Sequence, residues 1–251
     1  YLFLMSFFLL NKFLKNKLYA RLICHAIFYN VFKLMIFNQL FDDKSSTYTY
    51  IIASGIGREA LIIDPVIEKT EEYIKILKEL NLKLVKVIDT HIHADHITGL
   101  NELSKRTNCT KIMGDQSKSE VIDLKVKEDD KIQIDKIELK TIYTPGHTDC
   151  SYSFLMNDRV FTGDTLLING TGRTDFQNGS AKTQYESLFN KLLKLPEKTM
   201  VYPAHDYNGR KFSTIGDEKN KNPRLQVDNV DQYVEIMNNL KLANPKMMDV
   251  A

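Results

Sequence analysis

The sequence predicts a single α/β domain in which helices pack on the faces of a β-sheet. Between residues 60 and 89, a β-branched stretch, an amphipathic stretch and a second β-branched stretch follow one another. Such a strand–helix–strand unit requires a sheet that is covered by helices. The chain has 251 residues, of which 43% are hydrophobic, so it can bury one core of ordinary size.

The individual elements follow from hydrophobic periodicity and from turn residues. Stretches rich in Ile, Val, Thr and Tyr predict strands, whereas apolar residues three or four positions apart predict helices. A turn at 54–57 separates the first two strands, and two hairpins are expected around Asp135-Lys136 and Asn157-Asp158. The expected strands are 47–52, 60–65, 84–89, 132–134, 137–143, 152–156, 159–162 and 200–202, and the expected helices are 68–80, 98–105, 183–195 and 230–240.

Charge and cysteine content exclude several classes of protein. The net charge of +2 has no long basic run with it, so we expect no nucleic-acid partner. Cys24, Cys109 and Cys150 are far apart and form no CxxC pair, which excludes a disulfide scaffold or a zinc knuckle and favours a reducing compartment. Cys150 lies three residues after His147, where it is either a neighbour of a metal site or a small buried residue.

The first 41 residues contain five Lys or Arg residues and no acidic residue. This apolar and basic character predicts a mitochondrial presequence, with a secretory signal or a non-native upstream segment as alternatives. If this segment is not a mitochondrial presequence, we expect the protein in the cytoplasm or in another organelle. The first apolar run of about ten residues is too short to span a bilayer, so no stable membrane association is expected. We therefore divide the chain into a segment 1–33 and a folded domain 34–251 that ends in a short helical extension.

Five of the six histidines fall within three short motifs, and an aspartate lies in a fourth. Each motif directly follows a predicted strand, where loops on a rigid sheet carry functional groups. Imidazole and carboxylate are preferred ligands of zinc and of iron, so the motifs predict a site for one or two metal ions. His25, outside the motifs, is expected to be an ordinary histidine. The candidate ligands are His91, His93, Asp95, His96, His147, Asp164 and His205.

The order and spacing of these motifs resemble the metallo-β-lactamase superfamily. The resemblance implies an αββα sandwich with a metal site at one edge. In the hydrolytic members, the matching residues hold two metal ions, and a bridging hydroxide attacks an ester, thioester or amide carbonyl. The implied ligand sets are His91, His93 and His147 for one ion, and Asp95, His96 and His205 for the other, with Asp164 bridging them.

The residues around the motifs are similar to those of the persulfide dioxygenases within this superfamily. The similar segments are 90–99, 163–168, 172–177, 202–209 and 222–225, within a resemblance that extends from about residue 37 to the C-terminus. The resemblance implies sulfide catabolism, in which glutathione persulfide reacts with O2 and water to give sulfite and glutathione. It also implies a homodimer.

This resemblance further implies one Fe(II) per chain, held by His91, His147 and Asp164. Two histidines and one carboxylate on one face leave coordination positions open for a persulfide and for dioxygen. The remaining candidates would orient ligands and water through hydrogen bonds; they are His93, Asp95, His96 and His205.

Two other functions stay open. A glyoxalase II-like hydroxyacylglutathione thioesterase would use a dinuclear site, and the complete ligand set is compatible with two Zn(II) per chain. Only 46 residues follow His205, however, whereas glyoxalase II typically carries a longer helical domain there. A non-catalytic relative that binds a metal or a partner protein is the third interpretation.

Substrate-binding residues are predicted from the chemistry of glutathione, an anionic tripeptide with two carboxylates. Such a ligand favours an Arg or Lys at the mouth of the site. Arg173, Tyr207 and Arg210 are the candidates because they lie close to the metal motifs in the sequence. As alternatives, Arg173 forms a structural ion pair with Asp175, and Arg210 is solvated. Thr171 occupies a position where some members of the family carry Cys.

Overall fold

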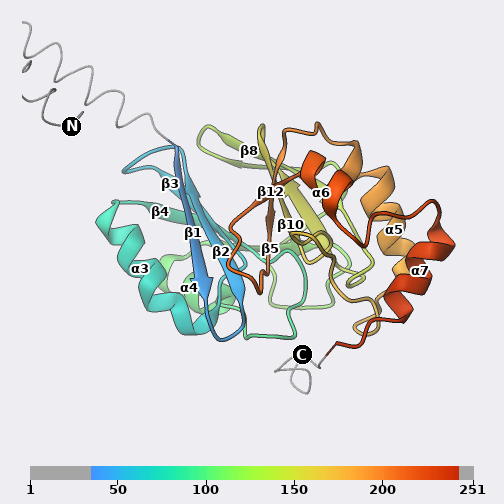
Figure 1. The fold of residues 1–251 in the computed structure, drawn as a ribbon. Helices are drawn as coiled ribbons and strands as arrows, with labels where there is room; N and C mark the ends of the chain where they lie inside the picture. The colour runs from blue at the N-terminus through green and yellow to red at the C-terminus, as the bar shows by residue number, and fades with distance from the viewer. Residues whose placement is uncertain (1–34, 243–251) are drawn as a thin grey trace, which may run out of the picture.

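In the computed structural model, two sheets face each other and helices cover both outer faces (Figure 1). The structure describes residues 35–242, so the expected presequence lies outside the described residues. The elements are β1 (Ile36–Asp42), β2 (Thr47–Ala53), β3 (Glu59–Ile63), η1 (Ile67–Lys69), α3 (Thr70–Glu79), β4 (Lys83–Ile88), α4 (Leu100–Thr107), β5 (Thr110–Gly114), β6 (Leu124–Val126), β7 (Lys131–Ile134), β8 (Ile137–Tyr143), β9 (Tyr152–Leu155), β10 (Arg159–Gly163), α5 (Ala181–Asn190), η2 (Leu192–Lys194), β11 (Met200–Pro203), β12 (Ser213–Thr214), α6 (Ile215–Lys221) and α7 (Val230–Asn238).

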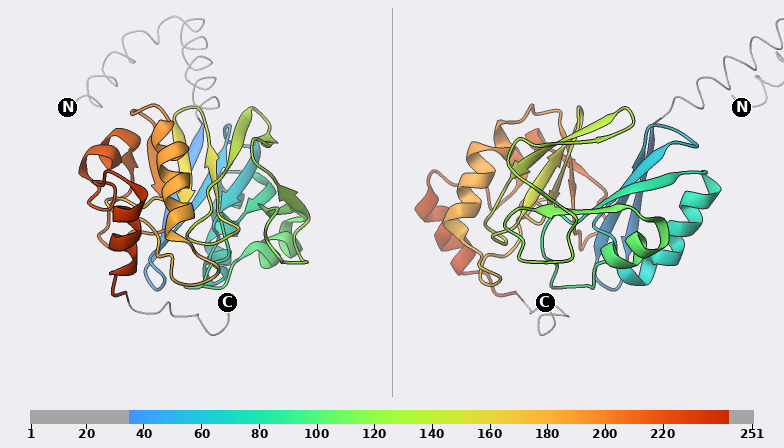
Figure 2. Two further views of the ribbon diagram at one scale, coloured as in Figure 1. Left: turned by 90° about the vertical axis from the view of Figure 1, so that its right-hand side faces the viewer. Right: turned by 180° about the vertical axis from the view of Figure 1, so that it is seen from behind.

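Each sheet has six strands. The first has the order β1-β2-β3-β4-β5-β6, with antiparallel pairs up to β3 and parallel pairs from β3 to β6. The second has the order β12-β11-β10-β9-β8-β7, in which only the pair of β10 and β11 is parallel. Helices α3 and α4 lie outside the first sheet and α5, α6 and α7 outside the second (Figure 2). This is the predicted αββα sandwich.

Alternation of side chains along the central strands fills the space on both sides of each sheet. On β2, Tyr50 and Ile52 point into the core between the sheets, while Ile51 and Ala53 pack in the cluster that includes residues of α3 and α4. Every residue of β2 is buried, as expected for a strand that is covered on both faces. Phe154 and Phe161 of the second sheet complete the inner core.

All eight predicted strands and all four predicted helices are present, with boundaries that differ by a few residues. The strand expected at 60–65 ends at Ile63, because Asp64 adopts a left-handed φ of 51° and Pro65 cannot donate a ladder hydrogen bond. The helix expected at 183–195 begins at Ala181 and ends at Asn190, and the single 3-10 turn η2 follows it. Elements β1, β5, β6, β12 and α6 were not predicted.

The two sheets are joined at the edge where β4, β8, β10 and β11 end. Thr47, the first residue of β2, forms a β-bridge with His205, and the Tyr48 amide donates to the Ala204 carbonyl over 2.7 Å. The Tyr50 hydroxyl donates to the Pro203 carbonyl over 2.6 Å. These bonds hold the candidate ligands of the two sheets at one edge. Within residues 35–242, no helix has the length and apolar character that crossing a bilayer requires.

We expect Phe154→Ala to lower the free energy of unfolding by about 3–5 kcal/mol, because it opens a cavity between the sheets. Phe154 is completely buried, whereas Phe212 is 52% exposed. Phe212→Ala is therefore the matched control and should cost about 0.5 kcal/mol or less. Urea unfolding followed by circular dichroism measures both, and equal losses would contradict the layered core.

Candidate metal centre

The carboxylate of Asp64 fixes the loop that carries the first histidines. It accepts hydrogen bonds from the Thr90 amide (2.7 Å) and from the Thr90 hydroxyl (3.0 Å), directly after β4. Asp64 also lies 3.2 Å from Nε2 of His93. The sequence analysis did not select Asp64, because it placed this residue inside the strand expected at 60–65, whereas β3 ends at Ile63.

His91, His147 and Asp164 form one candidate ligand group, in which one ligand atom of each lies within 4.8 Å of the others. The Nδ1 of His147 donates to the Arg173 carbonyl over 2.7 Å. The Nδ1 of His91 lies 2.9 Å from the Thr90 hydroxyl, which gives its own proton to Asp64 and so accepts from the ring. Both histidines are thereby held with Nε2 unprotonated and available to a metal ion. This donor set fits a single divalent ion.

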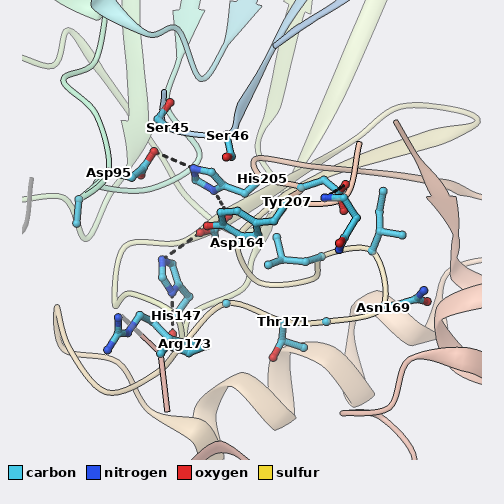
Figure 3. A pocket seen from close by; sticks show the side chains of 18 of the residues that line it. Ser45, Ser46, Asp95, His147, Asp164, Asn169, Thr171, Arg173, His205 and Tyr207 are labelled. Atoms are coloured by element: carbon cyan, nitrogen blue, oxygen red, sulfur yellow. Dashed lines mark hydrogen bonds and ion pairs between the residues drawn. The ribbon is translucent and has the colours of Figure 1, made fainter. Parts of the chain in front are cut away.

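A row of contacting groups runs through the site, from Asp95 through His205, Asp164 and His147 to the Arg173 carbonyl (Figure 3). Its members are joined by hydrogen bonds except for Asp164 and His147, whose Oδ2 and Nε2 atoms lie 3.6 Å apart. His205 donates from Nε2 to Asp95 over 2.8 Å and from Nδ1 to Asp164 over 2.6 Å. Because both acceptors are carboxylates, both ring nitrogens of His205 carry protons. His205 therefore occupies the row as a cation between two anions.

The remaining candidates surround Asp95. His96 Nδ1 and the Thr47 hydroxyl lie 2.8 Å and 3.0 Å from the Asp95 Oδ2 atom that also contacts His205. His93, Asp95 and His96 form a second candidate ligand group, and Nδ1 of His93 and Nε2 of His96 are buried without a hydrogen-bond partner. All seven predicted ligands are therefore together, and Thr47 joins them although no sequence motif indicated it.

Burial and the neighbouring charges decide which groups are ionised. Burial lowers the pKa of His91 and of His147, which keeps both neutral, as ligands must be. Burial also opposes ionisation of Asp164, but the charge and hydrogen bond of His205 outweigh it and hold the carboxyl pKa below its usual range. The pKa of His205 is raised well above its usual value, because Asp164 and Asp95 overcome the effect of burial. The centre thus offers two neutral imidazoles and one carboxylate.

Two glycines let the loops approach the ligands closely. Gly146, directly before His147, has a φ of 135° and lies against the backbone of Gln184 in α5. A Cβ atom on Gly172 would lie 2.8 Å from Nδ1 of His147 and would also clash with the Asp164 carbonyl. A side chain at either position would displace a candidate ligand.

A cavity of about 610 Å³ opens beside His147, Asp164 and His205. Its wall is formed mainly by the loop that follows β10, together with Ser45 and Ser46 before β2 and the segment after His205 (Figure 3). Such a volume is typical of sites for small molecules. The candidate metal ligands therefore border a space that a substrate can enter.

The predicted substrate-binding residues all line this cavity, but two of them are paired within the protein. Arg173 forms a two-point ion pair with Asp175 (2.6 and 2.7 Å), which is the structural alternative expected for it. Arg210 binds Asp206 through Nε and Nη2 (3.1 and 2.7 Å), so the expectation of a merely solvated side chain was wrong. Tyr207 is 71% exposed at the mouth and its ring lies parallel to that of His205.

The sequence analysis missed a third arginine of the cavity wall. Arg224 follows α6 and donates from Nη1 to the carbonyl and to the hydroxyl of Thr171. Among residues 35–242, no carboxylate forms an ion pair with Arg224. Burial lowers the pKa of its guanidinium, which nevertheless stays charged. The only sequence signal for Arg224 was its position in segment 222–225, which is similar to the persulfide dioxygenases.

The family model described as the metallo-beta-lactamase superfamily matches residues 42–205. The chain therefore belongs to the metallo-β-lactamase superfamily, as predicted, and the crystal structure of ETHE1 from Myxococcus xanthus superimposes on it with a TM-score of 0.84 and 46% identity, over 86% of this chain and 96% of that one.

Within the superfamily, the chain is similar to the proteins named mitochondrial persulfide dioxygenase ETHE1. It is 42% identical to the protein of Mus musculus over 220 residues, 86% of each chain. A hydroxyacylglutathione hydrolase of Pelagibacter ubique is 33% identical over 204 residues, 78% of this chain and 83% of that protein. The predicted resemblance to persulfide dioxygenases is confirmed.

We expect Gly172→Ala to lower the affinity for a divalent metal ion by about tenfold or more, because its Cβ would displace Asp164 and His147. Gly170→Ala is the matched control, since a Cβ there would meet nothing nearer than 3.9 Å. Calorimetric metal titration of the apoproteins measures the affinities. Equal affinities of the two variants would show that Gly172 does not shape the centre.

Proposed function

We propose that this protein is a persulfide dioxygenase that oxidises glutathione persulfide with O2 and water to sulfite and glutathione. The observation that carries the proposal is 42–46% identity to ETHE1 proteins across 86% of the chain. The cavity beside His147 and Asp164 supports it, because it brings a substrate next to the metal ligands.

We propose one Fe(II) per chain, held by His91, His147 and Asp164. Two imidazoles and one carboxylate with further open positions are the donor set of non-haem iron oxygenases. When bound, Fe(II) supplies the electron transfer to dioxygen that Zn(II) cannot provide. The hydrogen bonds of His205 support a single ion, because both of its ring nitrogens are already bonded to carboxylates.

The neighbouring residues orient this ligand set. His205 occupies Oδ1 of Asp164, which leaves Oδ2 on the side of His147, 3.6 Å from its Nε2. Asp95 accepts from the other side of His205, and Thr47 bonds to Asp95 in turn. His93, Asp95, His96 and His205 then act as groups that hold the ligands and the local charge.

We propose that Arg224 binds a carboxylate of the glutathione moiety. The charges of Arg173 and Arg210 are compensated by Asp175 and Asp206, whereas Arg224 lines the cavity without an acidic partner among the described residues. Arginine binds carboxylates through two parallel N–H bonds. Tyr207 offers an exposed ring at the mouth for the peptide portion.

The relatives named mitochondrial support a mitochondrial location for this chain as well. We propose that residues 34–251 form the catalytic domain and that residues 1–33 are a presequence, which lies outside the described residues. A homodimer is proposed on family resemblance.

The second candidate is a hydroxyacylglutathione hydrolase, which the 33% identity to the Pelagibacter ubique protein favours. A site for a second ion would draw on the unpartnered nitrogens of His93 and His96 beside Asp95. Such an enzyme would cleave a thioester without consuming oxygen.

The two functions differ in metal content and in oxygen consumption. We expect anaerobically purified protein to contain about one iron per chain and to consume O2 when glutathione persulfide is added. Asp164→Ala should lose both the iron and the activity, because it removes the anionic ligand. Elemental analysis and an oxygen electrode measure these quantities. Two zinc ions per chain, with hydrolysis of S-D-lactoylglutathione and no oxygen uptake, would overturn the proposal.

For Arg224→Ala, we expect the KM for glutathione persulfide to rise about tenfold to hundredfold with little change in kcat, because a charge-assisted hydrogen bond is lost. Arg106→Ala is the control, since Arg106 pairs with Glu102 and Glu71 on the surface, away from the cavity. Steady-state oxygen uptake measures both constants. An unchanged KM in the Arg224 variant would remove Arg224 from the substrate site.

A further inference from the structure

Three polar side chains are buried in the apolar layer between the second sheet and the helices α5 and α7. Thr171 is 2% exposed, and Gln184 and Tyr233 are completely buried. Leu188 and Met237 belong to the same layer. In Figure 3 the Thr171 side chain points away from Asp164 toward the helices, so it does not face the metal ligands.

Hydrogen bonds connect these side chains to Arg224 in one continuous network. Nη1 of Arg224 donates to the Thr171 carbonyl and to its Oγ1, the latter over 3.2 Å. The Tyr233 hydroxyl lies 3.2 Å from Thr171 Oγ1 and 2.7 Å from Gln184 Oε1. Gln184 Nε2 donates to the Gly172 carbonyl over 3.1 Å. The network therefore extends from Arg224 at the cavity wall to the carbonyl of Gly172, the residue that packs against His147.

Stability alone does not account for this arrangement. Burying a hydroxyl or an amide is costly unless it is hydrogen-bonded, and replacing both partners of a buried bond by apolar groups of the same shape is nearly neutral. Val at position 171 and Phe at position 233 would fill the same volume in this layer, whereas Gln184 also supplies the donor for the Gly172 carbonyl. What the polar residues add is a fixed direction for the groups that they bond.

The group that gains this direction is the Arg224 guanidinium. Thr171 provides two acceptors for Nη1, its carbonyl and its hydroxyl. Nε and Nη2 of Arg224 have no acceptor among residues 35–242. The edge formed by Nε and Nη2 carries two parallel N–H bonds, the geometry that matches a carboxylate. An arginine that is fixed at one end in this way loses less side-chain entropy when it binds a ligand.

We propose that Thr171, Tyr233 and Gln184 form a positioning network that orients Arg224 and thereby sets the affinity of the cavity for a carboxylate-bearing persulfide. This inference rests on the proposed function and adds the residues that determine its substrate specificity. Because Gln184 also bonds the Gly172 carbonyl and packs against Gly146, the network fixes the carboxylate anchor relative to His147. The distance between the sulfur and the carboxylate of the substrate is therefore selected as well.

The test compares Thr171→Val, which removes the hydroxyl at nearly constant shape, with Thr171→Ser, which keeps it. We expect Thr171→Val to raise the KM for glutathione persulfide and the Kd for glutathione about threefold to tenfold, with kcat unchanged. Thr171→Ser should restore both constants. Tyr233→Phe, should the valine variant fail to fold, must raise the same constants in the same direction.

Tyr73→Phe is the matched control for the loss of a buried tyrosine hydroxyl. Tyr73 Oη lies 2.9 Å from Thr49 Oγ1 between β2 and α3, away from the cavity. It should lower stability to a similar extent as Tyr233→Phe, as measured by urea unfolding, and leave KM unchanged. A rise in KM for this control would mean that any buried hydroxyl loss produces the effect, and would overturn the proposal.

A double-mutant cycle decides whether Thr171 acts through Arg224. In the Arg224→Ala background, Thr171→Val should have no further effect on KM or on glutathione binding. Equal effects in both backgrounds, or no effect of Thr171→Val in the wild-type chain, would overturn the inference. If the wild-type protein consumes no oxygen with glutathione persulfide, the proposed function fails, and calorimetric glutathione binding still tests the network by itself.

Discussion

The imidazolium of His205 between the carboxylates of Asp95 and Asp164 is the interaction on which the centre depends. Asp164 and Asp95 are brought close together at the joined edge of the two sheets. Two neighbouring carboxylates repel each other, and a cation between them offsets this repulsion. His205 supplies that cation and is itself held in place by its β-bridge to Thr47 in the opposite sheet. The joint between the sheets and the charge balance of the site are therefore one structural unit, and the electrostatic state of Asp164 follows from how the strands meet.

Much of the fold could be predicted because β2, β4 and α3 show clear periodicity. Short or interrupted elements could not: β6 has three residues, two of them exposed, and β1 reads Ile-Phe-Asn-Gln-Leu-Phe-Asp, with two polar residues at its centre. Such strands exist because neighbouring strands pair with them, and a local pattern does not contain that information. The early end of β3 depends on a backbone conformation at Asp64 that side-chain hydrophobicity does not encode.

The site could be predicted where the chemistry lies in side chains that are close in sequence, as in the motif from His91 to His96. It could not be predicted where one partner is a backbone carbonyl or a distant residue. Arg224 is oriented by Thr171, 53 positions earlier in the chain, and no pattern in the sequence relates them. Arg210 appeared free because the turn that brings it back to Asp206 is visible only in three dimensions. Tertiary contacts, rather than residue identity, separate Arg224 from the two arginines of the cavity wall whose charges are already paired with carboxylates.

The loop after β10 has two roles: it lines the cavity, and its Arg173 carbonyl accepts the hydrogen bond that holds His147. A mutation in this loop would therefore shift the position of His147 and the shape of the cavity together, so the two cannot vary independently. The helical layer behind it has no ligand of the centre, so its residues can diverge while the chemistry is kept. Substitutions in α5 and α7 would therefore act on the cavity wall through Gln184 and Tyr233 while every candidate ligand is kept.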